Sequence, residues 1–259
     1  MNSVQFQDYF SSVSANYARF RPTYPTGLFE VVARYAPALD CAWDCATGSG
    51  QAALGLSRHF RKVVATDASP EQVQHATLVT NVEYRVALAE DSGIETATVN
   101  AVAVAQALHW FNRDQFYSEV RRVCTPGAIL AVWFYNGLDL SFSPQVDEVM
   151  HRLDKLLMDY WPPVYDELKK SFHHKEELFS LLSFPFEPLP TPSIELAVHW
   201  DLGELLGALS TSSAGQRCVA MGDQAQLMHL FEDLSVAWGD PAEKKTGVES
   251  LALRIGRVT

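Results

Sequence analysis

The stretch Ala42-Trp43-Asp44-Cys45-Ala46-Thr47-Gly48-Ser49-Gly50-Gln51-Ala52-Ala53 decides the fold. Its first four residues are typical of a short buried strand, and the residues after Gly50 are typical of the start of a helix. Two glycines at such a turn let the backbone bend tightly and approach a ligand closely. The amide groups at the start of the helix favour electronegative ligand atoms. The stretch therefore predicts a strand, a ligand-binding loop and a helix in direct succession.

The same strand-and-helix rhythm continues from about residue 40 to residue 135. Five short runs are apolar almost throughout, which is typical of parallel strands covered on both faces. The predicted strands are Ala42–Cys45, Val63–Thr66, Val82–Val86, Ala101–Ala105 and Ala128–Phe134. Strands that alternate with helices over short connections predict an α/β fold with a doubly wound sheet. Two later strands are predicted at Ile194–Trp200 and Ser250–Val258, the last of them antiparallel at the far side of the sheet.

Helix start signals lie between these strands. Ser69-Pro70-Glu71-Gln72 offers a serine N-cap, a proline at the first helical position and Gln72 to close a capping box. Asn112 and Gln115 repeat this spacing ahead of a second helix, which we expect Pro126-Gly127 to end.

The second half of the chain predicts mostly helices. Ser143-Pro144 opens a long helix, Asp201 and Asp223 each cap another, and the four prolines of 184–192 predict a loop. We expect one domain over residues 1–259. Its predicted parts are an N-terminal lid and first helix at 1–40, a cofactor-binding core at 41–136, a helical acceptor cap with a late strand at 137–248 and a final strand at 249–259.

Composition narrows the partners. The 259 residues include 20 Lys and Arg against 31 Asp and Glu, a formal net charge of −11, which opposes nucleic-acid phosphates and anionic membranes. A small molecule is the preferred partner. The four cysteines form no CxxC pair, so we expect free thiols, no metal site and a cytoplasmic location. Nothing in the composition fixes the oligomeric state.

Two kinds of cofactor fit the glycine loop. Gly48-x-Gly50-x-x-Ala53 satisfies the dinucleotide fingerprint in its Gly/Ala form. Asp44 argues against it, because a carboxylate there would repel a pyrophosphate but could position a cationic amino group. Asp67, at the end of the second strand, can accept hydrogen bonds from both ribose hydroxyls of either cofactor. The residues alone leave the choice between a nicotinamide and an adenosyl cofactor open.

The motifs together resemble a known family. Asp44-x-Ala46-Thr47-Gly48-Ser49-Gly50, Asp67 and Ala89-Glu90 resemble the first three motifs of class I S-adenosylmethionine-dependent methyltransferases. Three further stretches resemble the trans-aconitate methyltransferase-like subgroup of the type 11 methyltransferases. They are Tyr17-x3-Arg21-Pro22-x-Tyr24-Pro25, Val104-Ala105-Gln106-Ala107-Leu108-His109-Trp110-Phe111 and the run from Leu205 to Ala214.

The resemblance implies a Rossmann-like sheet of seven mostly parallel strands, with helices added over an acceptor pocket, and S-adenosylmethionine as cofactor. It places Asp44 near the methionine amino group, Asp67 at the ribose and Gln106 on the methionine side. The full set of cofactor residues it implies is Asp44, Ala46, Thr47, Gly48, Gly50, Asp67, Ala68, Ala89, Glu90 and Gln106.

Other side chains are candidates for the acceptor side. His109 follows the fourth strand at the carboxyl edge of the sheet, where ligands bind, and is the candidate general base. Arg21 could pair with a carboxylate of the acceptor or of the cofactor. The candidate substrate-binding residues are Tyr17, Arg21, Tyr24, Trp110 and Tyr135.

The sequence departs from the family pattern in two places near the cofactor. Ala46 replaces the usual first glycine and would be strained by about 1 kcal/mol if its φ is positive. Leu88 stands where many relatives have a polar residue near the adenine.

The predicted function is methyl transfer to a small molecule. O-methylation of a small carboxylic acid is preferred, on the subgroup resemblance alone. A nicotinamide-dependent oxidoreductase and a non-catalytic module that binds an adenosyl cofactor are the alternatives.

Overall fold

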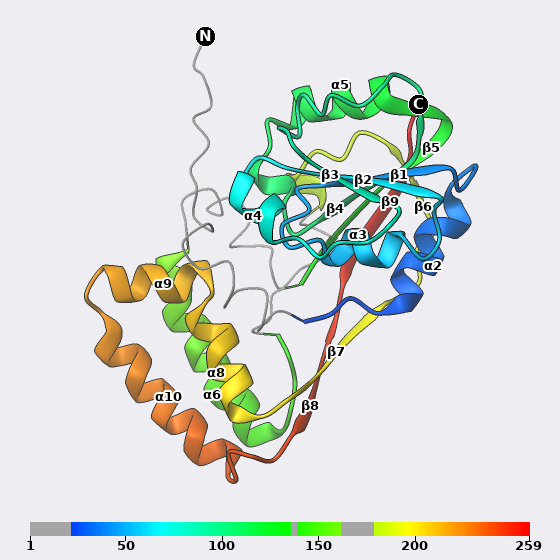
Figure 1. Ribbon diagram of the computed structural model, residues 1–259. Coiled ribbons are helices and arrows are strands. Elements are labelled where there is room, and N and C mark those ends of the chain that lie inside the picture. The colour runs from blue at the N-terminus through cyan, green and yellow to red at the C-terminus, as the bar shows by residue number, and fades with distance from the viewer. Residues whose placement is uncertain (1–21, 136–138, 162–178) are drawn as a thin grey trace.

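The computed structural model describes residues 22–135, 139–161 and 179–259 (Figure 1). Tyr17 and Arg21, which the sequence assigns to the acceptor site, lie outside the described residues. A sheet flanked by helices forms one part of the molecule, and a group of helices forms another. A two-stranded ribbon runs between them (Figure 1).

The main sheet has seven strands in the order β3-β2-β1-β4-β5-β9-β6. The first five strands of the chain pair in parallel, and β9 pairs antiparallel with both β5 and β6. The predicted doubly wound sheet with its last strand antiparallel is confirmed. The strands are β1 (Cys41–Cys45), β2 (Lys62–Asp67), β3 (Val82–Val86), β4 (Val99–Ala105), β5 (Cys124–Phe134), β6 (Glu187–Leu189) and β9 (Ala252–Arg257).

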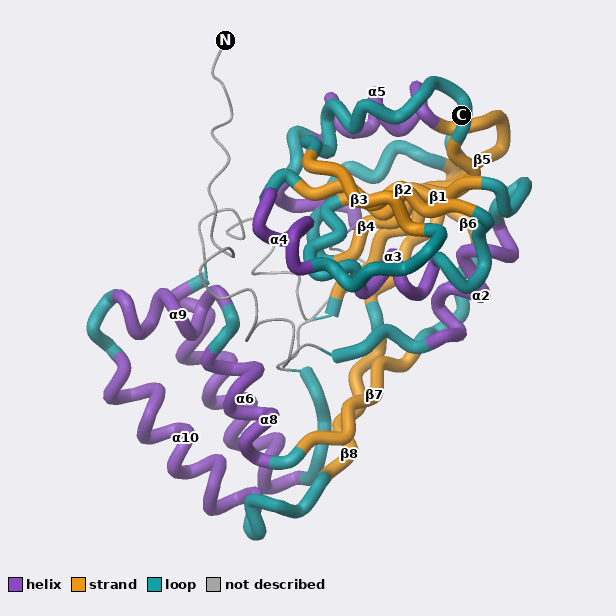
Figure 2. The backbone as a smooth tube through the Cα atoms, in the orientation of Figure 1, coloured by secondary structure: helices purple, strands orange, loops and turns teal. Residues whose placement is uncertain are grey.

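Helices cover both faces of this sheet. Figure 2 shows α5 (Arg113–Val123) on one face, and α2 (Thr26–Tyr35) and α3 (Gln51–Leu56) on the other. Neighbouring strand residues point to opposite faces, so Trp43 joins the core under α5 whereas Ala42 joins the core under α2 and α3. Burial on both faces explains why the central strands are apolar throughout.

The chain reverses its direction of travel across the sheet at β1. It leaves β1 toward β2 and β3, then returns to place β4 on the other side of β1. At such a topological switch point a crevice opens outside the carboxyl ends of the strands, and ligands of doubly wound sheets bind there. The glycine loop lies at this end of β1. The α4 helix (Pro70–His75) follows β2 at the same edge.

The remaining helices form a cap with an apolar core of their own. Leu153, Leu205, Leu234 and Trp238 are among its buried residues. The cap helices are α6 (Pro144–Leu157), the 3₁₀ helix η3 (Met158–Tyr160), α8 (Leu202–Ser210), α9 (Ser213–Ala220) and α10 (Gln224–Trp238). The ribbon of β7 (Glu195–Trp200) and β8 (Lys245–Ser250) connects this cap to the sheet.

Two local predictions are wrong. Pro126-Gly127 does not end α5, because the helix already ends at Val123 and both residues lie inside β5. The predicted loop 184–192 contains the short strand β6. Pro188 is compatible with β6 because this strand is at the edge of the sheet, where a missing N–H leaves no neighbour unpaired.

The predicted capping boxes at Ser69 and Asn112 form only in part. Each cap side chain accepts the amide of the glutamine three residues on, at 3.3 Å for Ser69 and 3.4 Å for Asn112. The cap amides are bonded to other groups. Ser69 N donates to Asp67 and Asn112 N donates to Glu90. Asp201 and Glu204, by contrast, form a complete box at α8.

Candidate functional site

The glycine loop leaves β1 in a strained conformation. Ala46 has φ 57°, so the condition for backbone strain at this alanine is met. Gly48 and Gly50 have φ 53° and 87°. Thr47 N donates to Thr66 O at 2.9 Å, which ties the loop to the end of β2. Backbone strain of this kind is concentrated at ligand sites, because the surrounding structure must hold it in place.

Asp44 is a fully buried carboxylate directly beneath this loop. Its Oδ2 accepts a 2.5 Å hydrogen bond from the Thr47 hydroxyl, while Oδ1 has no hydrogen bond of normal geometry within the described residues. Burial raises the pKa of Asp44 to about 7, although the Thr47 hydroxyl and the Ala53 amide partly offset this effect. A buried, incompletely bonded carboxylate needs a cationic partner to be stable in its ionised form.

Asp67 ends β2 and faces the same loop. Its Oδ2 accepts from Gly48 N at 2.8 Å, and its Oδ1 accepts from Ser69 N at 2.9 Å. A carboxylate can accept several hydrogen bonds at once, and one at the end of this strand is the kind of group that accepts from ribose hydroxyls. Ala68 is half-buried beside it.

Ala89 and Glu90 follow β3; Ala89 is buried and Glu90 is half-buried. Ala89 is buried in the core under α5. Glu90 Oε1 accepts from Asn112 N at 2.7 Å, which fixes the start of α5 against the segment after β3. Leu88, the departure from the family pattern, is exposed.

Gln106 connects the ends of β4 and β5. It has φ 58°, and its Nε2 donates to Tyr135 O at 2.6 Å. Tyr24 lies beside Tyr135 and Trp133, with ring centroids 6.3 Å and 5.5 Å away and the rings edge to face. The structure therefore brings Tyr24, Gln106 and Tyr135 together at this edge of the sheet.

His109 lies in the 3₁₀ helix η2 (Leu108–Trp110), just after β4. It is buried, with ring centroids 5.2 Å from Trp110 and 5.9 Å from Phe134. Burial, reinforced by the nearby Arg113 guanidinium, lowers the pKa of His109 to about 3. The imidazole is neutral at pH 7 and a weak proton acceptor.

Two residues that the sequence did not assign to the site lie against the glycine loop. A Cβ added at Gly50 would overlap the Tyr84 hydroxyl, which itself donates to Thr77 O at 2.7 Å. Gln72 points its side-chain oxygen at Gly48. The signals were weak: Tyr84 is an ordinary strand residue, and Gln72 has an adequate explanation as a capping residue.

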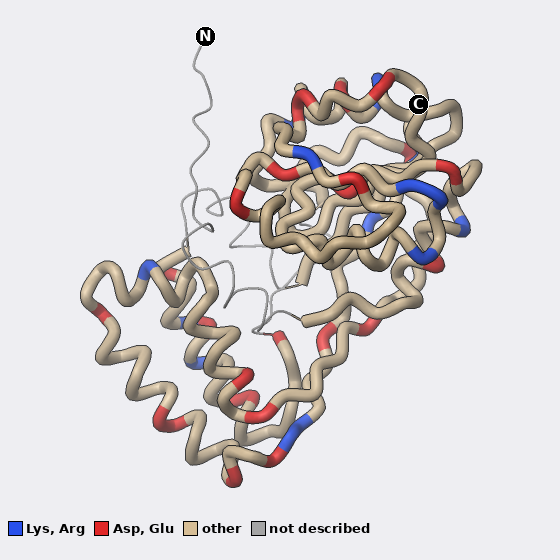
Figure 3. Tube along the Cα trace, viewed as in Figure 1, with Lys and Arg blue, Asp and Glu red and all other residues tan. Residues whose placement is uncertain are grey.

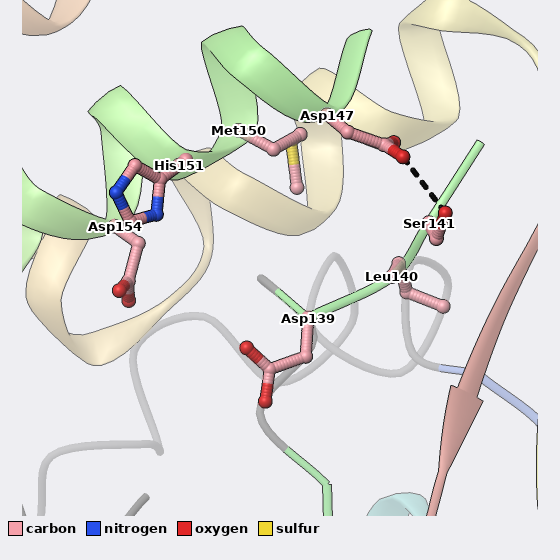
Figure 4. A pocket seen from close by; sticks show the side chains of 7 residues that line it. All are labelled: Asp139, Leu140, Ser141, Asp147, Met150, His151 and Asp154. Atoms are coloured by element: carbon pink, nitrogen blue, oxygen red, sulfur yellow. Dashed lines mark hydrogen bonds between the residues drawn. The ribbon is translucent and has the colours of Figure 1, made fainter. Parts of the chain in front are cut away.

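A separate hollow of about 240 Å³ lies in the cap, away from the glycine loop (Figure 4). Its carboxylates come from both α6 and the segment 139–141, and one of them, Asp147, accepts a hydrogen bond from the Ser141 hydroxyl at 2.7 Å. The lining residues are Asp139, Leu140, Ser141, Asp147, Met150, His151 and Asp154. Within the described ranges, no cluster of side chains has the composition of a metal site, and no helix is long and apolar enough to cross a membrane.

Comparison with known proteins identifies the family. The family model of a methyltransferase domain matches residues 43–132. A Dictyostelium discoideum protein assigned as a methyltransferase is 30% identical over 238 residues, covering 91% of this chain and 88% of that protein. The chain belongs to the class I S-adenosylmethionine-dependent methyltransferases. Its methyl donor is S-adenosylmethionine.

Other relatives support this assignment of the methyltransferase. A solved structure from Anaeromyxobacter dehalogenans, assigned as a type II methyltransferase, is 37% identical with a TM-score of 0.81, and the match covers 92% of this chain and 98% of that one. CRG1 of Saccharomyces cerevisiae, assigned as an S-adenosylmethionine-dependent methyltransferase, is 28% identical over 131 residues, 47% of this chain and 45% of that protein. Membership of this family sets aside the oxidoreductase and the non-catalytic alternatives.

The site of this methyltransferase fits its cofactor on structural grounds. The donor carries an ammonium group, which suits the buried Asp44 oxygen that lacks a normal hydrogen bond. Its ribose hydroxyls suit the carboxylate of Asp67. Among the described residues, a side chain added at Gly48 would meet nothing closer than Gln72 at 4.0 Å.

Proposed function

We propose that this methyltransferase O-methylates a small carboxylic acid and belongs to the trans-aconitate methyltransferase-like subgroup. The observation that carries the proposal is the buried, neutral His109. A hydroxyl or amine acceptor gains roughly 10²–10⁴ in rate from a general base. A carboxylate is already ionised near pH 7 and needs none. A site whose candidate base has a pKa of about 3 therefore suits an acceptor that is already anionic.

We propose the same cofactor-binding residues that the resemblance to the family implies. Asp44 pairs with the ammonium group, the backbone of Ala46, Thr47, Gly48 and Gly50 surrounds the amino acid and ribose, and Asp67 accepts from the ribose hydroxyls. Ala68, Ala89 and Glu90 border the adenine, and Gln106 lines the methionine side. The cofactor supplies a methyl group on a sulfonium centre, so the protein contributes position and a water-poor surrounding rather than a reactive side chain.

On the acceptor side, we propose that His109 contacts the acceptor as a neutral hydrogen-bonding residue. Trp110, Tyr24 and Tyr135 form the walls, which aromatic rings suit because they are large and rigid. Tyr17 and Arg21 stay predictions from the sequence, with Arg21 as the cation that holds the acceptor carboxylate. The cap of 137–248 completes the pocket, and 1–40, 41–136 and 249–259 are parts of the same domain.

Charge supports a small acceptor. Asp and Glu positions occur along both the sheet part and the cap (Figure 3), and the net charge of −11 opposes a nucleic-acid substrate. The four cysteines are free, in keeping with the predicted cytoplasmic location.

The test is a product assay with methyl-labelled S-adenosylmethionine and an acceptor panel. The panel contains saturated and unsaturated di- and tricarboxylic acids, phenols, amines and thiols, each at pH 6, 7, 8 and 9. With S-adenosylmethionine at saturating concentration at every pH, we expect base-labile methyl esters from acids only, at a rate that is nearly constant over this range. Transfer confined to phenols or amines, with a rate that rises with pH, would overturn the proposal.

A further inference from the structure

The side chain of Gln72 is buried in an unusual place for an amide. Gln72 is the third residue of α4 and is 7% exposed. Its Oε1 lies 4.0 Å from the position that a Cβ on Gly48 would occupy, so the amide faces the glycine loop. Within the described residues its side chain makes no hydrogen bond; only its backbone N–H is bonded, to Ser69 Oγ at 3.3 Å.

Helix capping does not account for this side chain. In a capping box the third helical residue bonds back to the amide of the cap residue. That amide, Ser69 N, is already bonded to Asp67 Oδ1 at 2.9 Å. The Gln72 amide instead faces Gly48.

The Gln72 side chain is mostly buried, but its amide atoms still reach solvent and can bond water in the unliganded protein. A methionine or leucine would suit the helix and this mostly buried position equally well. A molecule that binds above Gly48 would displace that water and meet the amide, because Gln72 is the one described residue within 4 Å of a Cβ added there.

We propose that Gln72 is a cofactor-binding residue whose side-chain amide hydrogen-bonds a ribose hydroxyl of the adenosyl cofactor, next to the hydroxyls' bonds to Asp67. This inference rests on the cofactor site proposed above. A carboxamide suits the position because it can both donate and accept, and because it adds no charge beside Asp67. The chemical class of the ligand is a nucleoside with free hydroxyls on its ribose.

The experiment compares Gln72→Met with Gln115→Met. Gln115 has the same position in α5, three residues after its cap, and its cap amide is likewise bonded to a carboxylate, that of Glu90. The Gln115 side chain is exposed, so Gln115→Met shows what the same substitution does at a helix position outside the cofactor site. Calorimetry gives the affinity of each protein for S-adenosylhomocysteine and for its 2′-deoxy and 3′-deoxy analogues. Thermal unfolding without ligand gives the stability.

We expect Gln72→Met to bind S-adenosylhomocysteine about 3- to 10-fold more weakly than the unsubstituted protein, the range for one neutral hydrogen bond. The Gln115→Met protein keeps its affinity within about twofold. The loss at Gln72 disappears with one of the two deoxy analogues. The unliganded Gln72→Met protein is about as stable as the unsubstituted protein, because the Gln72 side chain makes no hydrogen bond to the described residues and methionine suits a mostly buried helix position.

Other results overturn the inference in distinguishable ways. Equal affinity of the Gln72→Met and unsubstituted proteins for S-adenosylhomocysteine would show that Gln72 does not contact the cofactor. A lower unfolding temperature without ligand, together with the affinity loss, makes Gln72 a structural support. A loss that persists with both deoxy analogues moves the contact off the ribose. If the unsubstituted protein does not bind S-adenosylhomocysteine, the proposed cofactor site itself fails and the Gln72 contact fails with it.

Discussion

The carboxylate of Asp67 accepts a 2.8 Å hydrogen bond from the backbone amide of Gly48, nineteen residues earlier in the chain. This bond joins the end of β2 to the glycine loop after β1. It means that the residue proposed to bind the ribose also holds the loop proposed to surround it. The site is thus positioned before any ligand arrives, which lowers the entropy cost of binding.

Cofactor affinity should depend on pH through Asp44. Its pKa is raised to about 7 by burial, so the carboxyl is protonated below that pH and cannot pair with an ammonium group. Affinity for S-adenosylhomocysteine should therefore rise with pH between about 5 and 7, by up to about tenfold per unit, and level off above 8. Calorimetric titration from pH 5 to 9 measures it.

Asp44→Asn is the control for this dependence. The amide cannot ionise, so affinity should be weaker at pH 8 and should no longer change between pH 5 and 7. Because the pKa of Asp44 is raised in the folded state, the free energy of unfolding falls as pH rises from about 4 to 7. Without ligand at pH 8, the Asp44→Asn protein should therefore be more stable than the unsubstituted protein. A pH dependence of binding that survives this substitution would assign it to another group.

Gly50 should tolerate a side chain poorly because of Tyr84. At φ 87° an alanine is strained, and its Cβ would also overlap the Tyr84 hydroxyl and lie 3.2 Å from Cζ of that ring. We expect Gly50→Ala to lower the free energy of unfolding by about 2–4 kcal/mol. Chemical denaturation measures the loss.

Gly93 supplies the matched control, because its φ is 64° and no atom of the part of the chain that the structure describes lies within 4 Å of an added Cβ. Gly93→Ala should cost only about 1 kcal/mol, the strain of the backbone alone. Adding Tyr84→Phe to Gly50→Ala should restore part of the loss. An equal loss of unfolding free energy in Gly50→Ala and Gly93→Ala would show that Tyr84 does not hinder a side chain at Gly50.

His109 should not titrate in the working range of the enzyme. With its pKa lowered to about 3, the imidazole stays neutral from pH 5 upward. With S-adenosylmethionine saturating at every pH, we expect kcat/KM for a carboxylic acid to show no inflection near pH 6.5, and we expect His109→Gln to lower it by about 3- to 10-fold without changing the shape of the profile. An inflection near pH 6.5 that disappears in His109→Gln would make His109 a general base.

The sheet was predictable because the local signals agree with one another. The buried strands are apolar throughout, and the Ser69, Asn112, Ser143 and Asp201 helix starts all lie where their cap side chains place them. Asp223 precedes α10 as predicted but makes no side-chain cap bond. The strand predicted at Ile194–Trp200 exists, but it pairs with β8 in the ribbon outside the main sheet.

The features that could not be predicted from the sequence depend on contacts between segments that are far apart in the chain. The sequence spacing of Ser69 and Gln72 matches a capping box. The structure shows that Ser69 N is bonded to Asp67 instead, so the Gln72 side chain does not complete the box. The pKa of His109 is likewise set by burial against Trp110 and Phe134, which motif spacing does not encode. Pro126-Gly127 carries a local stop signal, yet pairing of β5 with β4 and β9 places both residues in a strand.

The central claim is that the loop between β1 and α3, together with Asp67, binds an adenosyl cofactor. Calorimetric titration with S-adenosylmethionine and S-adenosylhomocysteine tests it most directly, alongside NAD, NADP and an Asp67→Ala protein shown by circular dichroism to be folded. We predict saturable binding of both adenosyl ligands, weakened at least about tenfold by Asp67→Ala, and no binding of either dinucleotide. Binding of NAD in their place, or equal adenosyl affinity in the Asp67→Ala protein, would contradict the account.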